Sequence, residues 1–196
     1  MPVRGRETRA QHDPRALFII RDVRYGDGIR AIEIEHRYIE TRPMSPEDKL
    51  AELKFELPAV PKPQGVYKPI VFVGNLIYVS GHGPLQADKT LIQGRVGADL
   101  DLDGGRRAAR QVGLAMLATL REYLGSLNRV RRLVKTFGLV NCTAEFHQQP
   151  AVINGFSELM AEVFGPENGI GARSAVGAPA LPGNMAVEVE AIFEIE

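Results

Sequence analysis

Residues 187–195 alternate between apolar and acidic positions, and this pattern limits the possible folds more than any other. One set of positions holds Val187, Val189, Ala191, Phe193 and Ile195, and the other set holds Glu188, Glu190 and Glu194. Successive side chains of a β-strand point to opposite faces of its sheet. A chain that ends in this way must therefore build a sheet with one face against a core and a second face that carries charge.

Earlier segments supply the other strands and two helices. Residues 71–73 and 76–79 are rich in β-formers and flank Gly74-Asn75, a pattern typical of a hairpin. Residues 103–124 and 150–164 have apolar side chains at helical spacing, and residues 133–140 form a further strand between them. The order predicts an α+β fold with both long helices on one face of a mixed sheet. The second face holds apolar side chains as well as glutamates, which favours burial against other subunits.

The first 43 residues differ in composition from the rest. Every fixed positive charge up to Arg42 is an arginine, and lysine first appears at Lys49. We therefore divide the chain into an N-terminal extension, residues 1–43, and a main domain, residues 44–196. Residues 17–20 and 32–35 flank a glycine turn at 26–28 and suggest a hairpin, which alone is marginally stable. It is either a docking element or a dispensable extension before a second start at Met44; Ser45 then caps a short helix.

Charge and composition exclude several classes of protein. The 196 residues carry 24 basic and 24 acidic side chains, so no overall field attracts nucleic acid, and nucleic-acid binding is unlikely on this ground. The single cysteine excludes an internal disulfide and fits a cytoplasmic protein. No apolar run is long enough to span a membrane, and no membrane association is expected. Metal clusters, phosphate loops and nucleotide fingerprints are absent, so we expect neither a metal nor a cofactor.

Several short patterns occur in the order and register found in the RidA (YjgF) family of reactive-intermediate deaminases, and residues 65–195 resemble that family. The resemblance rests on Gly65-Val66-Tyr67, Gly74-Asn75 followed by Ser80-Gly81, Leu133-Val134-Lys135-Thr136, Phe146 with Asn154, Ala172-Arg173-Ser174, Leu181-Pro182 and Glu188-Val189-Glu190. It implies a chorismate-mutase-like fold and a homotrimer with its sites between subunits. It also implies hydrolysis of small 2-imino acids, such as 2-iminopropanoate and 2-iminobutanoate, to 2-keto acids and ammonia.

The resemblance also assigns roles to residues. Arg173 holds the substrate carboxylate, Tyr67 and Ser80 line the cleft, Asn154 adds a polar contact, and Glu188 places or activates water. These residue types suit the chemistry, because a guanidinium can grip a planar carboxylate through two hydrogen bonds. An iminium carbon already reacts with water, so positioning and a proton acceptor are sufficient.

Two positions depart from the family pattern. Many active members carry a cysteine two residues after the arginine, where this chain has Ala175, and His82 replaces the glutamine of a Ser-Gly-Gln turn. Both residues are candidate cleft positions that alter its polarity and substrate range. Cys142 aligns with the loop after the central strand, and we interpret it as structural.

Each candidate also has a plainer interpretation. Arg173 could pair with Glu188 or Glu190, Tyr67 could be apolar cover, Ser80 could shape a turn, and Asn154 and Glu188 could face solvent. Two other functions compete with deamination. One is a trimer that binds or senses small carboxylates without turnover, and the less favoured one is an endoribonuclease that uses a basic patch of Arg129, Arg131, Arg132 and Lys135.

Overall fold

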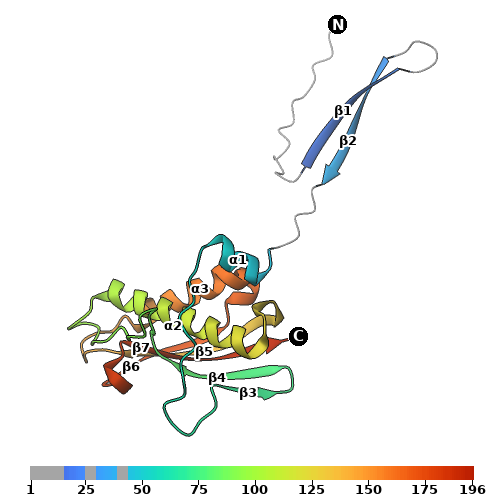
Figure 1. Cartoon of the computed structure of the whole chain (residues 1–196). Coiled ribbons are helices and arrows are strands. Elements are labelled where there is room, and N and C mark those ends of the chain that lie inside the picture. The colour runs from blue at the N-terminus through green and yellow to red at the C-terminus, as the bar shows by residue number, and fades with distance from the viewer. Residues whose placement is uncertain (1–15, 25–29, 39–43) are drawn as a thin grey trace. The chain divides into compact units, whose positions relative to one another are not determined.

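The computed structural model describes the backbone of residues 16–24 and 30–38 and the whole of residues 44–196 (Figure 1). The chain forms two compact units, Met1–Pro43 and Met44–Glu196. In the first unit, strands β1 (Ala16–Arg24) and β2 (Arg30–Tyr38) pair antiparallel, with Ala16 opposite Tyr38. The glycine turn expected between these strands lies outside the described residues.

The second unit begins with the short helix α1 (Pro46–Glu52). Its N-cap is Ser45, whose hydroxyl accepts a hydrogen bond from the backbone N–H of Asp48, as the sequence predicts. The carboxylate of Glu47 bonds the guanidinium of Arg121 and the backbone N–H of Leu127. These contacts hold α1 against the end of the following long helix.

Five strands form one mixed sheet in the order β3-β4-β7-β5-β6, so β3 and β6 are its edges. Strands β5 and β6 are parallel, and the other neighbours are antiparallel. The predicted succession of strands and helices is confirmed. The central strand is longer than the expected 133–140. The bounds are β3 (Ile70–Val73), β4 (Leu76–His82), β5 (Val130–Asn141), β6 (Ala172–Ala178) and β7 (Val187–Ile195).

Two long helices, α2 (Leu102–Leu124) and α3 (Gln149–Gly169), cover one face of this sheet (Figure 1). Asp101 caps the start of α2, and Gly125, with φ of 77°, ends it in the left-handed conformation. The regular part of α3 ends near Phe164, as predicted, because Gly165 has non-helical angles before a last turn. The helices pack closely at Gly155, where an added Cβ would overlap the carbonyl oxygen of Arg106. Two short 3₁₀ helices complete the unit, η1 (Leu127–Arg129) and η2 (Pro182–Asn184).

The two faces of the sheet have different surroundings. All five apolar side chains of β7 that share the helix-covered face are buried, as the alternation predicts. The opposite face, called the open face below, carries Tyr78, which is 43% exposed, together with the glutamates of β7. Glu194 is an exception because it is buried on this face, where Arg131, Arg132 and Asn75 all bond its carboxylate. Among the described residues, no helix has the length and apolar character that a membrane crossing requires.

Candidate active site

Arg173 lies on the edge strand β6, and its side chain points to the helix-covered face. Its backbone pairs with buried Thr136 of β5, so the two side chains share that face. Nη1 donates to Oδ1 of Asn154 at 2.9 Å and to Oγ of Ser157 at 3.0 Å, and Nη2 donates to the carbonyl oxygen of Pro150 at 3.3 Å. We call these four residues the edge cluster. The structure thus brings Arg173 and Asn154 together.

No carboxylate of the described residues lies within ion-pair distance of Arg173. Its three acceptors are neutral, and its salt bridges to Glu188 or Glu190, considered from the sequence, are not formed in the described chain. The half-buried guanidinium is therefore a cation without a counter-ion among the described residues. A fixed cation of this kind, with hydrogens left over, favours an anion as its partner.

Ala175 lies two residues along β6 from Arg173 and on the same face. It pairs with Gly138 of β5 and packs partly against the core. Its methyl group has no proton to exchange with a ligand. Cys142 is buried beside Gly177, and its sulfur accepts a hydrogen bond from Nε2 of Gln149 at 3.6 Å. These contacts agree with a structural role.

Ser80, Gly81 and Glu188 meet at the far end of β4, together with Glu190; these four residues form the open-face cluster. The Ser80 hydroxyl donates to the carbonyl oxygen of Lys68 at 2.8 Å. The carboxylate of Glu188 lies directly over Gly81, because a Cβ added at Gly81 would overlap its Oε1 atom. The missing side chain at Gly81 therefore makes the space that Glu188 occupies.

Glu188 is half-buried, and no hydrogen-bond partner for its carboxylate exists among the described residues. Burial raises its pKa above the ordinary value of 4.5, and the negative charge of Glu190 on the same face raises it further. A carboxylate with a raised pKa binds a proton more readily. That property suits a general base which works near neutral pH.

Tyr67 lies in the loop before β3 and is 48% exposed. Its hydroxyl accepts a hydrogen bond from the backbone N–H of Gln64 at 3.3 Å. The same loop runs beside Ser80, whose hydroxyl and N–H bond the carbonyls of Lys68 and Pro69. Tyr67 is thus the neighbour in sequence of Lys68, which bonds Ser80 of the open-face cluster, and its ring is accessible to solvent.

His82 does not join either cluster. It is buried, its Nδ1 lies 2.7 Å from the carbonyl oxygen of Ser80, and its Nε2 lies 2.8 Å from the hydroxyl of Thr119 on α2. Burial lowers its pKa below 6.5. Our expectation that His82 lines the cleft with Ser80 needs correction in this chain. A β-bulge between Val79 and His82 adds a residue to β4, so His82 pairs with Val189 and faces the helices.

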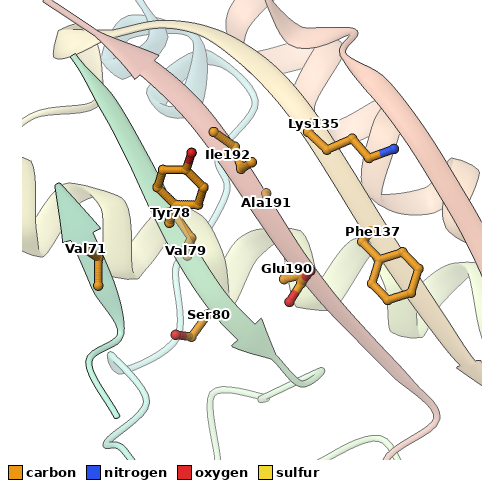
Figure 2. Close-up of a pocket in the computed structure, with 9 residues that line it drawn as sticks. All are labelled: Val71, Tyr78, Val79, Ser80, Lys135, Phe137, Glu190, Ala191 and Ile192. Atoms are coloured by element: carbon orange, nitrogen blue, oxygen red, sulfur yellow. The ribbon is translucent and has the colours of Figure 1, made fainter. Parts of the chain in front are cut away.

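A cavity of about 570 Å³ opens on the open face and is lined from four strands (Figure 2). In Figure 2, Lys135 and Phe137 of β5 lie across β7 from Tyr78 and Ser80 of β4, with Glu190 between them. The ammonium of Lys135 donates to the hydroxyl of Ser174 at 3.0 Å. Arg173 is not among the lining residues of this cavity.

The two clusters are therefore separate within one chain. Ser80 on β4 and Arg173 on β6 lie three strand spacings apart, about 14 Å across the sheet, and on opposite faces. We did not predict from the sequence that Ser157 and the carbonyl oxygen of Pro150 would contact Arg173. The spacing of positions 150, 154 and 157 places all three on one side of α3, which was the available signal. Among the described residues, no group of three or more His, Cys, Asp and Glu side chains could hold a metal ion.

The profile of the family described as "YjgF/chorismate mutase-like, putative endoribonuclease" matches residues 47–195. The chain belongs to this family. Members with solved structures include the RidA of an Antarctic Psychrobacter, which is 28% identical with a TM-score of 0.50 over 69% of this chain and 94% of that protein. The α+β fold of the YjgF/RidA family, predicted from the sequence, is thereby confirmed.

Other relatives are more similar to this chain. Protein TCP17 of Trypanosoma cruzi is 39% identical over 146 residues, which cover 74% of this chain and 91% of that protein. The structure of Atu1372 from Agrobacterium tumefaciens, a protein of unknown function, has 41% identity and a TM-score of 0.71 over 77% of this chain and 92% of that one. The structure of a protein from Shewanella oneidensis, described as a "putative endoribonuclease", has 30% identity and a TM-score of 0.74. The match covers 78% of this chain and 100% of that one. None of these names states an imine substrate.

Proposed function

We propose that this member of the YjgF/RidA family hydrolyses small 2-imino acids, of the 2-iminopropanoate and 2-iminobutanoate kind, to 2-keto acids and ammonia. The observation that carries the proposal is the state of Arg173, a half-buried cation that three neutral acceptors anchor and no described carboxylate neutralises. A substrate carboxylate supplies the missing charge and is held in a fixed orientation.

Glu188 then acts as the proton acceptor. Its carboxylate takes a proton from water as the water oxygen bonds to the C=N carbon, which gives a carbinolamine. Return of that proton to the nitrogen lets the C–N bond break, so ammonia leaves, and the hydroxyl group gives its own proton to Glu188 as the C=O bond forms. The raised pKa of Glu188 supports both transfers, because the group holds the proton between the two steps.

The separation of the two clusters leads us to place this site between subunits of a homotrimer. The edge cluster of one copy would face the open-face cluster of the next. The open face has the apolar and polar surface that such a contact needs, with Tyr78, Val71 and Val73 each over 40% exposed. Neither cluster alone holds both the cation and the base.

The test is turnover of an imine made in place. An amino-acid oxidase generates 2-iminobutanoate, semicarbazide traps it, and added protein should lower the trapped amount. We expect Arg173→Ala to remove this effect, while Arg106→Ala, which breaks an exposed pair with Glu158 on the helix surface, leaves it unchanged. An active Arg173→Ala protein would refute the assignment of this residue.

A trimer that binds small carboxylates without turnover is the second candidate. Ala175 favours it, since the methyl group cannot exchange protons beside Arg173. In that case the protein would bind 2-oxobutanoate through Arg173, yet the amount of trapped imine would be the same with and without it.

Endoribonuclease activity finds less support. Two arginines of the basic patch, Arg131 and Arg132, bond the buried carboxylate of Glu194, and Lys135 bonds Ser174. Part of the patch is therefore already neutralised. Cleavage of RNA in metal-free buffer that Arg173→Ala abolishes would favour this function over ours.

A further inference from the structure

The guanidinium of Arg173 has more hydrogens than the described residues use. An arginine side chain carries five N–H groups. The two hydrogens of Nη1 match two acceptors, Oδ1 of Asn154 at 2.9 Å and Oγ of Ser157 at 3.0 Å. Nη2 has one acceptor, the carbonyl oxygen of Pro150 at 3.3 Å. The hydrogen of Nε and one hydrogen of Nη2 have no acceptor among the described residues.

All three acceptors lie on helix α3. Positions 150, 154 and 157 follow each other at helical spacings of four and three residues, so they form one stripe along its first turns. The guanidinium therefore presents the end formed by Nη1 and Nη2 to the helix. Its remaining side, formed by Nε and Nη2, faces away from α3. The two hydrogens on that side are parallel and spaced to match the two oxygens of a carboxylate.

We propose that Ser157 is a positioning residue: with Asn154 it occupies both hydrogens of Nη1, and it thereby leaves the Nε–Nη2 side of Arg173 as the one that receives the substrate carboxylate. Asn154 alone would leave one hydrogen of Nη1 free. The guanidinium would then be anchored less firmly and would present its Nε–Nη2 side to the substrate for a smaller fraction of the time, which weakens binding.

This inference rests on the proposed function for its substrate class, a small 2-imino or 2-keto acid. It adds a definite binding mode. A carboxylate held side-on by Nε and Nη2 fixes the plane of the C1–C2 unit, and with it the face of the C=N bond that water attacks. Ser157 touches no reacting atom, so its removal should weaken substrate and transition state equally.

The first test is Ser157→Ala with Ser157→Thr as its matched control. Loss of one hydrogen bond to the charged group should raise KM for the imine about threefold to tenfold while kcat stays within about twofold. The threonine keeps a hydroxyl and should restore KM. If Ser157 had only a structural role, the alanine variant would have a lower Tm and an unchanged KM. Unchanged KM in the alanine variant, or a kcat that falls in parallel, overturns the inference.

The second test does not need turnover. The Nε–H resonance of Arg173, identified by its loss in Arg173→Lys, is followed by NMR as 2-oxobutanoate is added, with neutral butanamide as the control. We expect the Nε–H resonance to shift in a saturable way with 2-oxobutanoate and not with butanamide. The Kd for the acid should be several-fold larger in Ser157→Ala. The Nε–H resonance of Arg106, on the outer surface of α2, should stay in place.

The two tests separate the proposals. If the Arg173 Nε–H responds to the acid and no imine is hydrolysed, the deaminase assignment fails and the binding mode stands. If imine is hydrolysed while the Nε–H does not respond to the acid, the binding mode fails and the deaminase assignment stands. Absence of both binding and turnover overturns both.

Discussion

The edge cluster around Arg173 and the open-face cluster around Glu188 hold opposite charges in different ways. Arg173 is anchored by three neutral acceptors, and its position is fixed before any ligand arrives. Glu188 has no described hydrogen-bond partner and lies in a space left by a glycine. A rigid cation suits binding and orientation, whereas an under-solvated carboxylate suits proton transfer. The division of roles follows from how each charge is compensated.

Glu194 shows that this difference does not come from the strand itself. It lies on the same strand and face as Glu188, yet Arg131, Arg132 and Asn75 bond its carboxylate. Glu194 has three partners at one end of β7, whereas Glu188, at the opposite end, has none among the described residues. Only the second is available to a substrate or to water.

The largest expected effects on activity are those of substitutions at Arg173 in the edge cluster and at Glu188 in the open-face cluster. Arg173→Ala and Glu188→Gln should each lower kcat/KM at least about tenfold to a hundredfold. Because we place the two residues of one site on different subunits, co-expression of both variants in equal amounts should restore one site in each mixed trimer, which is about one quarter of all sites. The imine-trapping assay measures this recovery. Mixed trimers that stay as inactive as either variant would show that both residues serve one subunit's site.

The next effect concerns the space under Glu188. An alanine at position 81 should displace the carboxylate and lower kcat/KM about tenfold, because the base is misplaced. Gly74→Ala is the matched control: its φ of 60° makes alanine unfavourable by about 1 kcal/mol, yet nothing lies within 4 Å of the added methyl. Activity and urea unfolding of both variants give the comparison. Equal activities would mean that the position of Glu188 has no catalytic importance.

A smaller effect should appear in stability. Because the pKa of Glu188 is raised in the folded state, the unfolded chain holds the proton less tightly, and ionisation opposes folding. Stability should therefore fall as the pH rises from 4.5 through the folded-state pKa. Glu188→Gln removes this loss, so the variant should be more stable than wild type at pH 7 although it is less active. Thermal unfolding at pH 4 and pH 7 measures the difference, and a variant less stable at pH 7 would contradict the burial cause.

The smallest effect on activity is expected at His82. It contacts Thr119 and the carbonyl of Ser80 and reaches neither cluster, so His82→Gln should change kcat/KM by less than about threefold. Its lowered pKa means that the neutral ring stabilises the fold fully above 6.5 and that this stability is lost as the pH falls toward the folded-state pKa. The glutamine variant should lose less stability between pH 7 and pH 5. A large fall in activity would return His82 to the site.

Local sequence patterns were sufficient to predict most of the elements. The alternation in residues 187–195, the Gly74-Asn75 turn and the glycine after residue 124 act over a few residues, so the expected strands and helices match the structure closely. The YjgF/RidA family could also be recognised from the sequence, because its members share short patterns in a fixed order. The predicted site residues remain predictions, with Arg173 and Asn154 in contact and His82 moved to the core.

The surroundings of each charge were decided by the tertiary structure. Strand β6 pairs in parallel with β5, and only this long-range pairing sets Arg173 over the acceptors of α3. The bulge in β4 reverses the side to which His82 points, although strict alternation would place it with Ser80. Periodicity fixes which residues share a face over a few positions. Which neighbour satisfies a charge depends on segments that are distant in the chain, and that information exists only once the chain has folded.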